Sequence, residues 1–232
     1  MLTGENRTTS ASSCRNYARL VLLLAFDTAT PAVTVGLLDG STVLAESTVL
    51  DARRHGELLA PGIEAMMRDA GREPAELTAV AVGLGPGPYT GLRVGIVTAA
   101  SLGHALGIPA YGACSLDVIA AEAKPGEDFV VATDARRREI YWAVYDETGR
   151  RVSGPHVNRP ADVPVGGRRV EGPAVDLYGR AMGWRAGPER HPRAGTLARM
   201  VRDRAGAGEA ADPLLPLYLR RPDAVERAGT PA

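Results

Sequence analysis

The sequence predicts an α/β fold made of two copies of one unit, each containing a mixed β-sheet. In the first half, short apolar runs of strand length alternate with helical patterns. The second half repeats a strand–Asp–turn–strand–Asp pattern, since Asp27 and Asp39 are matched by Asp134 and Asp146 at an offset of 107 (134 − 27 and 146 − 39). Such similarity indicates a duplicated domain, with two chance hairpins as the alternative.

The first unit contains four apolar runs of strand length: Leu20–Phe26, Ala32–Leu38, Val43–Leu50 and Leu77–Leu84. The first run is continuously apolar, which is typical of a strand covered on both faces. We read it as a strand rather than a signal peptide, because no clear cleavage site follows, and it is far too short to span a bilayer. Asp39-Gly40 favours a tight hairpin between the second and third runs.

The first expected helix is Arg53–Ala70, whose apolar residues recur at helical spacing and which Gly71 would end. Pro61 lies inside this pattern and cannot donate a backbone hydrogen bond. The helix therefore either starts near Leu58 or is bent at the proline.

The stretch "GLGPGPYTGLRVG", Gly83–Gly95, joins the fourth run to a second helix, Thr90–Leu106, which Thr90 can N-cap and Gly107 ends. A strand, a glycine-rich turn and a helix N-terminus together form the geometry that binds phosphate. The sequence nevertheless matches neither the P-loop nor the dinucleotide fingerprint. The stretch therefore has the shape of a phosphate site without its full chemistry.

Small residues recur every four positions along the second helix, at Gly91, Gly95, Ala99 and Gly103. Each helical glycine costs about 1 kcal/mol relative to alanine, so a close backbone approach must offset the cost. A helix of another protein and the chain's own sheet are both candidates for that approach. If it is another protein, Gly95→Leu should leave the monomer folded and abolish partner binding.

The second half begins with two strands, Phe129–Asp134 and Glu139–Asp146, and ends with a short helix, Ala194–Arg204, and an apolar segment, Pro213–Ala224. We therefore expect tails at 1–18 and 226–232, a first domain at 19–112 and a second at 113–225, the last part of which can pack back on the first.

Composition excludes several functions. Lys+Arg and Asp+Glu both number 27, so the chain carries no net charge, whereas a protein that binds nucleic acid alone is usually basic. H-x-x-x-H and C-x-x-C motifs are absent from the sequence, so no metal site is expected. Two cysteines are consistent with a reducing, cytoplasmic compartment.

Asp27 and Asp134 end equivalent strands and can flank a cleft, where carboxylates hold Mg²⁺ or orient a water molecule. Arg136–Arg138 follow Asp134 and form either a solvated, ion-paired face or a contact for an anion or RNA. The candidate nucleotide or anion contacts are Asp27, Thr28, Gly85, Gly87, Thr90 and Arg136.

Five stretches resemble the bacterial TsaB (YeaZ) family: "LLLAFDTAT", "RRHGELLAPGIEAMM", "GLGPGPYTGLRVG", "DARRREIYWAVY" and "YLRRPDA". The resemblance is strong over residues 20–145 and looser to about residue 225. It implies the duplicated fold of actin, hexokinase and Hsp70. Pro88-Tyr89 departs from the Ser-Phe of many relatives and adds a hydroxyl group.

The resemblance implies a non-catalytic subunit of the complex that transfers threonylcarbamoyl to the adenosine next to the anticodon in tRNA. Its partners would be a catalytic TsaD-like paralogue and a TsaE-like ATPase, with tRNA bound only through the complex and a homodimer formed when alone. No tightly bound cofactor is implied, although ATP or ADP with Mg²⁺ can lie at the subunit interface. No catalytic residues are expected.

The family's dimer contact uses the first two long helices. Carried over, the expected interface residues are Leu59, Ile63, Met66, Met67, Gly91, Leu92, Gly95, Ala99 and Gly103. The alternative functions are a stand-alone enzyme of the same fold, either a phosphotransferase or a metallopeptidase-like hydrolase, and an RNA-binding module. The missing metal motif disfavours the hydrolase and the neutral charge disfavours the RNA-binding module.

Overall fold

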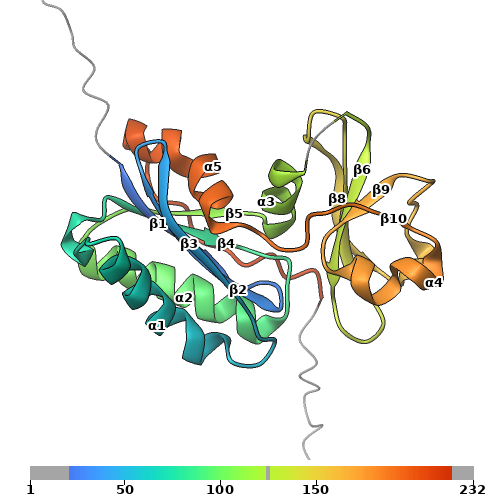
Figure 1. The fold of residues 1–232 in the computed structure, drawn as a ribbon, viewed down its shortest axis with the longest axis horizontal. Helices are drawn as coiled ribbons and strands as arrows, with labels where there is room; N and C mark the ends of the chain where they lie inside the picture. Colours follow the sequence, from blue (N-terminus) through green and yellow to red (C-terminus); the bar gives the residue numbers. More distant parts are fainter. Residues whose placement is uncertain (1–20, 124–125, 221–232) are drawn as a thin grey trace, which may run out of the picture.

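The structure, a computed structural model, describes residues 21–123 and 126–220. The expected tails, residues 1–18 and 226–232, lie outside these ranges. The described chain forms two sheets side by side, each with helices packed on it (Figure 1). Within these ranges, no helix has the length and apolar character needed to cross a bilayer.

The first sheet has the strand order β3-β2-β1-β4-β5. Its strands are β1 (Leu22–Asp27), β2 (Ala32–Asp39), β3 (Thr42–Leu50), β4 (Ala79–Gly83) and β5 (Ala110–Ala113). The first three strands form an antiparallel meander, and β4 and β5 run parallel to β1. The sheet is mixed, as expected.

Both faces of the first sheet are covered (Figure 1). Alternate residues of β1 point to opposite sides, so Leu24 packs beneath α1 (His55–Asp69) and α2 (Tyr89–Leu106), whereas Leu23 faces α5 (Ala194–Ala207). This two-sided burial explains why the first strand is a continuous apolar run.

The helices begin differently from the expected positions. α1 already starts at His55, so the alternative of a start near Leu58 is wrong and Pro61 lies in the helix interior. α2 starts after Pro88 without a side-chain cap, so Thr90 does not cap it. Gly71 and Gly107, at φ +62° and +64°, occupy the left-handed conformation that ends each helix, as expected.

The second sheet has the order β10-β9-β6-β7-β8. Its strands are β6 (Phe129–Asp134), β7 (Ile140–Tyr145), β8 (Arg151–Asn158), β9 (Arg169–Glu171) and β10 (Arg185–Ala186). β6, β7 and β8 are antiparallel and β9 and β10 run parallel to β6, so strand order and direction match the first sheet. The duplication expected from the sequence offset is confirmed.

The helices of the second unit are mostly short. α3 (Ser115–Glu122) covers one face of its sheet. The other short helices of the chain are η1 (Pro74–Glu76), η2 (Pro160–Asp162), η3 (Val175–Gly179) and α4 (Arg180–Met182). In the described chain, therefore, the long helix pair α1–α2 has no counterpart on the second sheet.

The last part of the range expected for the second domain, which was expected to be able to pack back, lies against the first sheet. α5 buries Ala194, Leu197 and Val201 against the first sheet. After α5, the backbone N–H of Asp212 donates to the Ala110 carbonyl, and that of Leu217 donates to the Leu84 carbonyl. Residues 194–218 thus belong to the first unit, because the apolar stripe of α5 needs a sheet face and α3 already covers one face of the second sheet.

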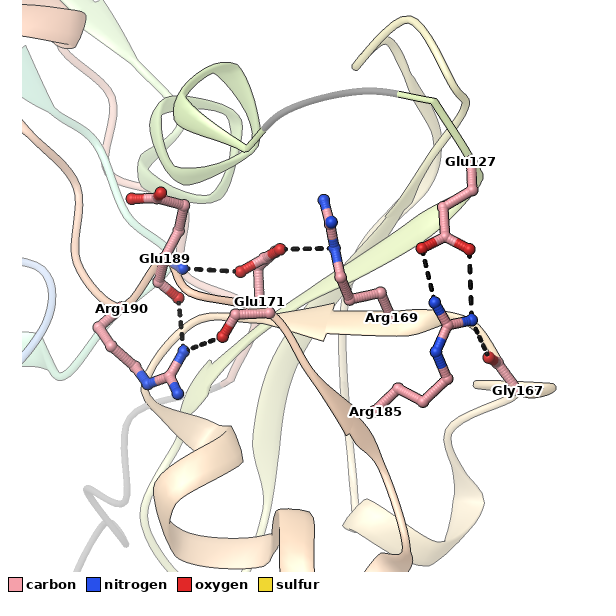
Figure 2. Close-up of polar contacts among 8 residues, drawn as sticks. Glu127, Gly167, Arg169, Glu171, Arg185, Glu189 and Arg190 are labelled. Carbon is pink, nitrogen blue, oxygen red and sulfur yellow. Dashed lines mark hydrogen bonds and ion pairs between the residues drawn. The ribbon is translucent and has the colours of Figure 1, made fainter.

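The buried carboxylate of Glu171 holds a neighbouring loop against β9 of the second sheet (Figure 2). Glu171 is fully buried at the end of β9, with Arg169 Nε 2.8 Å from its Oε1 and the Glu189 N–H donating to its Oε2 at 2.8 Å. Arg190 bonds the carbonyls of Gly187 and Glu189. Burial, with the nearby carboxylates, raises the pKa of Glu189. These contacts hold residues 187–190 against β9.

Candidate functional site

The glycine loop between β4 and α2 folds tightly over the end of β1. A Cβ atom at Gly83 would overlap the Asp27 carboxylate, and one at Gly87 would overlap the Ala29 carbonyl. Gly83 and Gly87 are therefore required for close packing within the chain.

Asp27 is the centre of this packing and is 1% exposed. One carboxylate oxygen accepts from the Ala29 N–H at 2.7 Å and the other from the Ser115 hydroxyl at 2.5 Å. Ser115 Oγ also accepts from the Gly85 N–H at 3.2 Å. The network joins β1, the glycine loop and the start of α3, and it occupies the carboxylate that a metal ion would need.

We expect Ser115→Ala to destabilise the protein by about 1–3 kcal/mol, because it removes a donor to Asp27 and leaves the buried Gly85 N–H without its acceptor. Urea denaturation measures this loss. Ser101→Ala, at an exposed position of α2, is the matched control and should change stability by less than about 0.5 kcal/mol. Equal stability of the two variants would contradict the network.

Burial raises the pKa of Asp27 above its ordinary value of 3.8, and this effect outweighs the opposing hydrogen bonds from Ser115 and Ala29. The folded state therefore binds this proton more tightly than the unfolded state. Asp27 contributes stability below its unfolded pKa and loses that contribution as the pH rises through its folded pKa. The free energy of unfolding of wild type should fall relative to that of Asp27→Asn as the pH rises above about 4. Parallel pH curves for the two proteins would refute this.

The expected anion contacts do not form one open site. Asp27, Thr28, Gly85 and Gly87 are buried, and the Thr28 hydroxyl donates to the Gly91 carbonyl at 2.7 Å. Thr90 is exposed on α2, and Arg136 lies on the other sheet, in the turn between β6 and β7. The structure gives the predicted ligand contacts at Asp27 and Thr28 no support, because both residues are buried and their polar atoms make internal hydrogen bonds.

The small-residue stripe of α2 faces the chain itself. A Cβ at Gly95 would lie 2.6 Å from Thr28 Oγ1, and one at Gly91 would lie 2.5 Å from the Thr28 carbonyl oxygen. Gly103 approaches the Ile108 carbonyl, and Ala99 is fully buried. The prediction that these residues contact a partner is wrong, because helical spacing identifies a close approach but not the surface approached.

Four other expected interface residues also belong to the core: Leu59, Met66, Met67 and Leu92 are at most 5% exposed. Ile63 is only partly buried. The helix pair itself nevertheless presents an outward surface, between α1 and α2.

A groove of about 520 Å³ runs between the two helices. Its lining residues are Ala60, Ile63, Glu64, Met67, Arg68, Gly71, Arg72, Glu73, Pro74, Thr98 and Leu102. Its floor is mostly apolar, and charged side chains stand among its lining residues. This combination of an apolar centre and a charged rim is typical of a protein-binding surface.

The groove shares only some residues with the expected interface. Of the residues expected there, Ile63 and Met67 line the groove, whereas Ala60, Thr98 and Leu102 were not expected. Val97, one residue before Thr98, is 60% exposed but does not line the groove. Single exposed apolar residues are common, so the sequence carried no clear signal for the added lining residues.

The described residues give little support for a metal site or a reactive nucleophile. In the described part of the chain, no group of three or more His, Cys, Asp or Glu side chains is placed to hold a metal ion. Ser153 Oγ lies 3.0 Å from His156 Nε2 on β8, and the Trp142 ring packs on that imidazole at 4.8 Å. Cys114 is buried and its pKa is raised to about 11 by burial, so it is a weak nucleophile.

Comparison with known proteins agrees with this fold. A family model described as "TsaD: tRNA N6-adenosine threonylcarbamoyltransferase" matches residues 43–193. An uncharacterised protein of Mycobacterium tuberculosis is 48% identical over 204 residues, covering 87% of this chain and 93% of that protein.

Two further matches are more specific. The "tRNA threonylcarbamoyladenosine biosynthesis protein TsaB" of Escherichia coli is 33% identical over 202 residues, covering 84% of each chain. The solved structure of YeaZ from Pseudomonas aeruginosa has a TM-score of 0.73 at 27% identity, covering 86% of this chain and 100% of that chain. The chain therefore belongs to the TsaB (YeaZ) family of tRNA threonylcarbamoyladenosine biosynthesis proteins.

Proposed function

We propose that this chain is the non-catalytic subunit of a complex that transfers a threonylcarbamoyl group to the adenosine next to the anticodon in tRNA. In this proposal it binds and activates a TsaD-type catalytic subunit. The match to the TsaD family model supports a partner of similar fold.

The groove between α1 and α2 is the observation that carries the proposal. Ile63 and Leu102 supply apolar surface, and Arg68 and Glu73 supply charges that can fix the orientation of a partner. The two helices are held from below by the buried stripe of α2 and by the core residues of α1. A rigid helix pair with a preformed groove loses little conformational entropy on binding.

The proposal also covers the other partners, a nucleotide and the location of the protein. A TsaE-like ATPase would join the complex, tRNA would bind through it, and the isolated chain would pair with a second copy through the same groove. ATP or ADP with Mg²⁺ at the subunit junction would need ligands other than Asp27 and Thr28, which are buried and bonded internally. A cytoplasmic location is part of the same proposal.

Omission from a reconstituted reaction tests the role. The mixture contains the catalytic partner, the ATPase, the enzyme that supplies the activated adenylate, and tRNA. Mass spectrometry of digested tRNA measures the modified nucleoside. Loss of product only when this chain is omitted supports the proposal, and unchanged product contradicts it.

A stand-alone enzyme is the alternative. The closed glycine loop stands against a phosphotransferase, since Asp27 has no free carboxylate oxygen. The Ser153–His156 pair is the one described contact that favours a hydrolase. ATP binding or turnover by the isolated chain, or an esterase activity that Ser153→Ala removes, would favour the enzyme.

A further inference from the structure

A second surface lies where the last described segment crosses from the first sheet to the second (Figure 1). We call it the Tyr–Arg surface. Its members are Tyr89 and Arg93 of α2, Tyr218 and Arg220 of the final segment, and Arg136, Arg137 and Arg138 of the β6–β7 turn. It is separate from the α1–α2 groove, whose lining residues include none of these.

Two exposed tyrosines form its aromatic part. The rings of Tyr89 and Tyr218 stack with their centroids 5.4 Å apart, and they remain 46% and 40% exposed. The Arg93 guanidinium lies 4.2 Å from the Tyr89 centroid and donates from Nε to the Tyr218 hydroxyl at 3.2 Å. This arrangement presents aromatic surface and a fixed positive charge together.

The arginine turn forms its basic part. Arg136, Arg137 and Arg138 have φ angles of +62°, +55° and +62°, and all three are exposed. Each residue other than glycine held in this left-handed region costs roughly 1–2 kcal/mol. The structure therefore keeps three adjacent arginines on one exposed turn at a cost in stability, and such local strain is concentrated at functional sites.

Arg220 joins the two parts. Its guanidinium donates to the Ala135 carbonyl at 3.1 Å and pairs with Glu139, while Tyr218 is only two residues earlier in the chain. Among the described residues, Asp134 pairs with Arg136 and Glu139 pairs with Arg220. Five arginines thus gather at this surface, although the whole chain carries no net charge.

We propose that the Tyr–Arg surface holds unpaired nucleotides of the tRNA anticodon loop, with bases stacked at Tyr218 and Tyr89 and phosphates contacted by Arg138 and its neighbours. Proteins recognise unpaired RNA in this way, by aromatic stacking and by arginine contacts to the backbone. This rests on the proposed function, which places that loop at the complex. The contribution is made within the complex, which agrees with the neutral charge of the isolated chain.

The test measures RNA affinity of the assembled complex with the catalytic partner, using a fluorescein-labelled anticodon stem-loop RNA and anisotropy over a salt series. Tyr218→Ala should weaken binding about tenfold, whereas Tyr218→Phe, which keeps the ring, should bind like wild type. Arg138→Ala should weaken binding and lower the slope of log K against log salt by about one. Arg199→Ala, at an exposed arginine of α5, is the matched control and should change neither quantity.

Unchanged affinity in both Tyr218→Ala and Arg138→Ala, in a complex that still modifies tRNA, would overturn this inference and leave the proposed function standing. Loss of the catalytic partner by Tyr218→Ala on gel filtration would also overturn it, since the surface would then be a protein contact. Failure of the wild-type mixture to depend on this chain would instead contradict the proposed function. Arg138→Ala keeps the test valid if Tyr218→Ala releases the final segment, because Arg138 lies on the turn between β6 and β7.

Discussion

Ala60→Arg is expected to weaken binding of the catalytic partner by at least about a hundredfold, while the isolated chain stays folded. Ala60 is exposed on α1 and lines the α1–α2 groove. Arginine is a good helix former, so the helix itself should tolerate the change. In the complex, however, the long side chain would fill the groove and its charge would lose its water, which costs about 3 kcal/mol or more. Titration calorimetry with the catalytic subunit measures the loss.

Ala100→Arg is the matched control, because the same residue is changed to the same side chain on the same helix pair. Ala100 is exposed and stands two residues after Thr98, so it lies about 200° round α2 from the groove. It should bind the partner as wild type does. If Ala100→Arg lost the partner and Ala60→Arg kept it, the groove would be the wrong surface.

Gly95→Leu should destabilise the isolated chain by more than about 3 kcal/mol or prevent it from folding. The structure reverses the sequence-based expectation that only partner binding would suffer. The first added carbon would already lie 2.6 Å from Thr28 Oγ1 and 3.4 Å from Val82 Cγ2, and the rest would be forced between α2 and the sheet. Urea denaturation followed by circular dichroism measures the effect.

Ala100→Leu places the same side chain on the exposed side of the same helix and should change stability by less than about 0.5 kcal/mol. A Gly95→Leu chain as stable as Ala100→Leu would mean that α2 does not pack on β4 as described. The two variants therefore separate the internal contact of the stripe from the general effect of adding leucine to α2.

The sequence predicted β1 to β4, β6 and β7, because local patterns decide them, but it did not predict β5, β8, β9 or β10. A strand buried on both faces must be apolar throughout, and Leu22–Asp27 is such a strand. The offset of 107 between the aspartates predicted the matching topology of the two sheets, since equivalent strands and turns keep equivalent spacing. The helix ends at Gly71 and Gly107 were predictable for a similar reason, because glycine accepts the left-handed conformation without strain.

The site was harder to predict, because it depends on contacts between distant residues. Ser115, which closes the site around Asp27, stands 88 residues away in the sequence. The return of α5 to the first sheet depends on which sheet faces remain uncovered. The left-handed turn of Arg136–Arg138 contains no glycine, so no residue in its sequence predicts that conformation. The periodicity of α2 identified its small-residue face correctly, but the α2 residues that line the groove proposed for the partner are Thr98 and Leu102.

The most direct test of the groove and its role is the yield of threonylcarbamoyladenosine in the reconstituted reaction, with this chain supplied as wild type, Ala60→Arg or Ala100→Arg. We expect full product with wild type and Ala100→Arg, and a loss with Ala60→Arg that a large excess of the variant partly restores. Full product with Ala60→Arg at limiting concentration would contradict the account, because the reaction would then proceed without the groove.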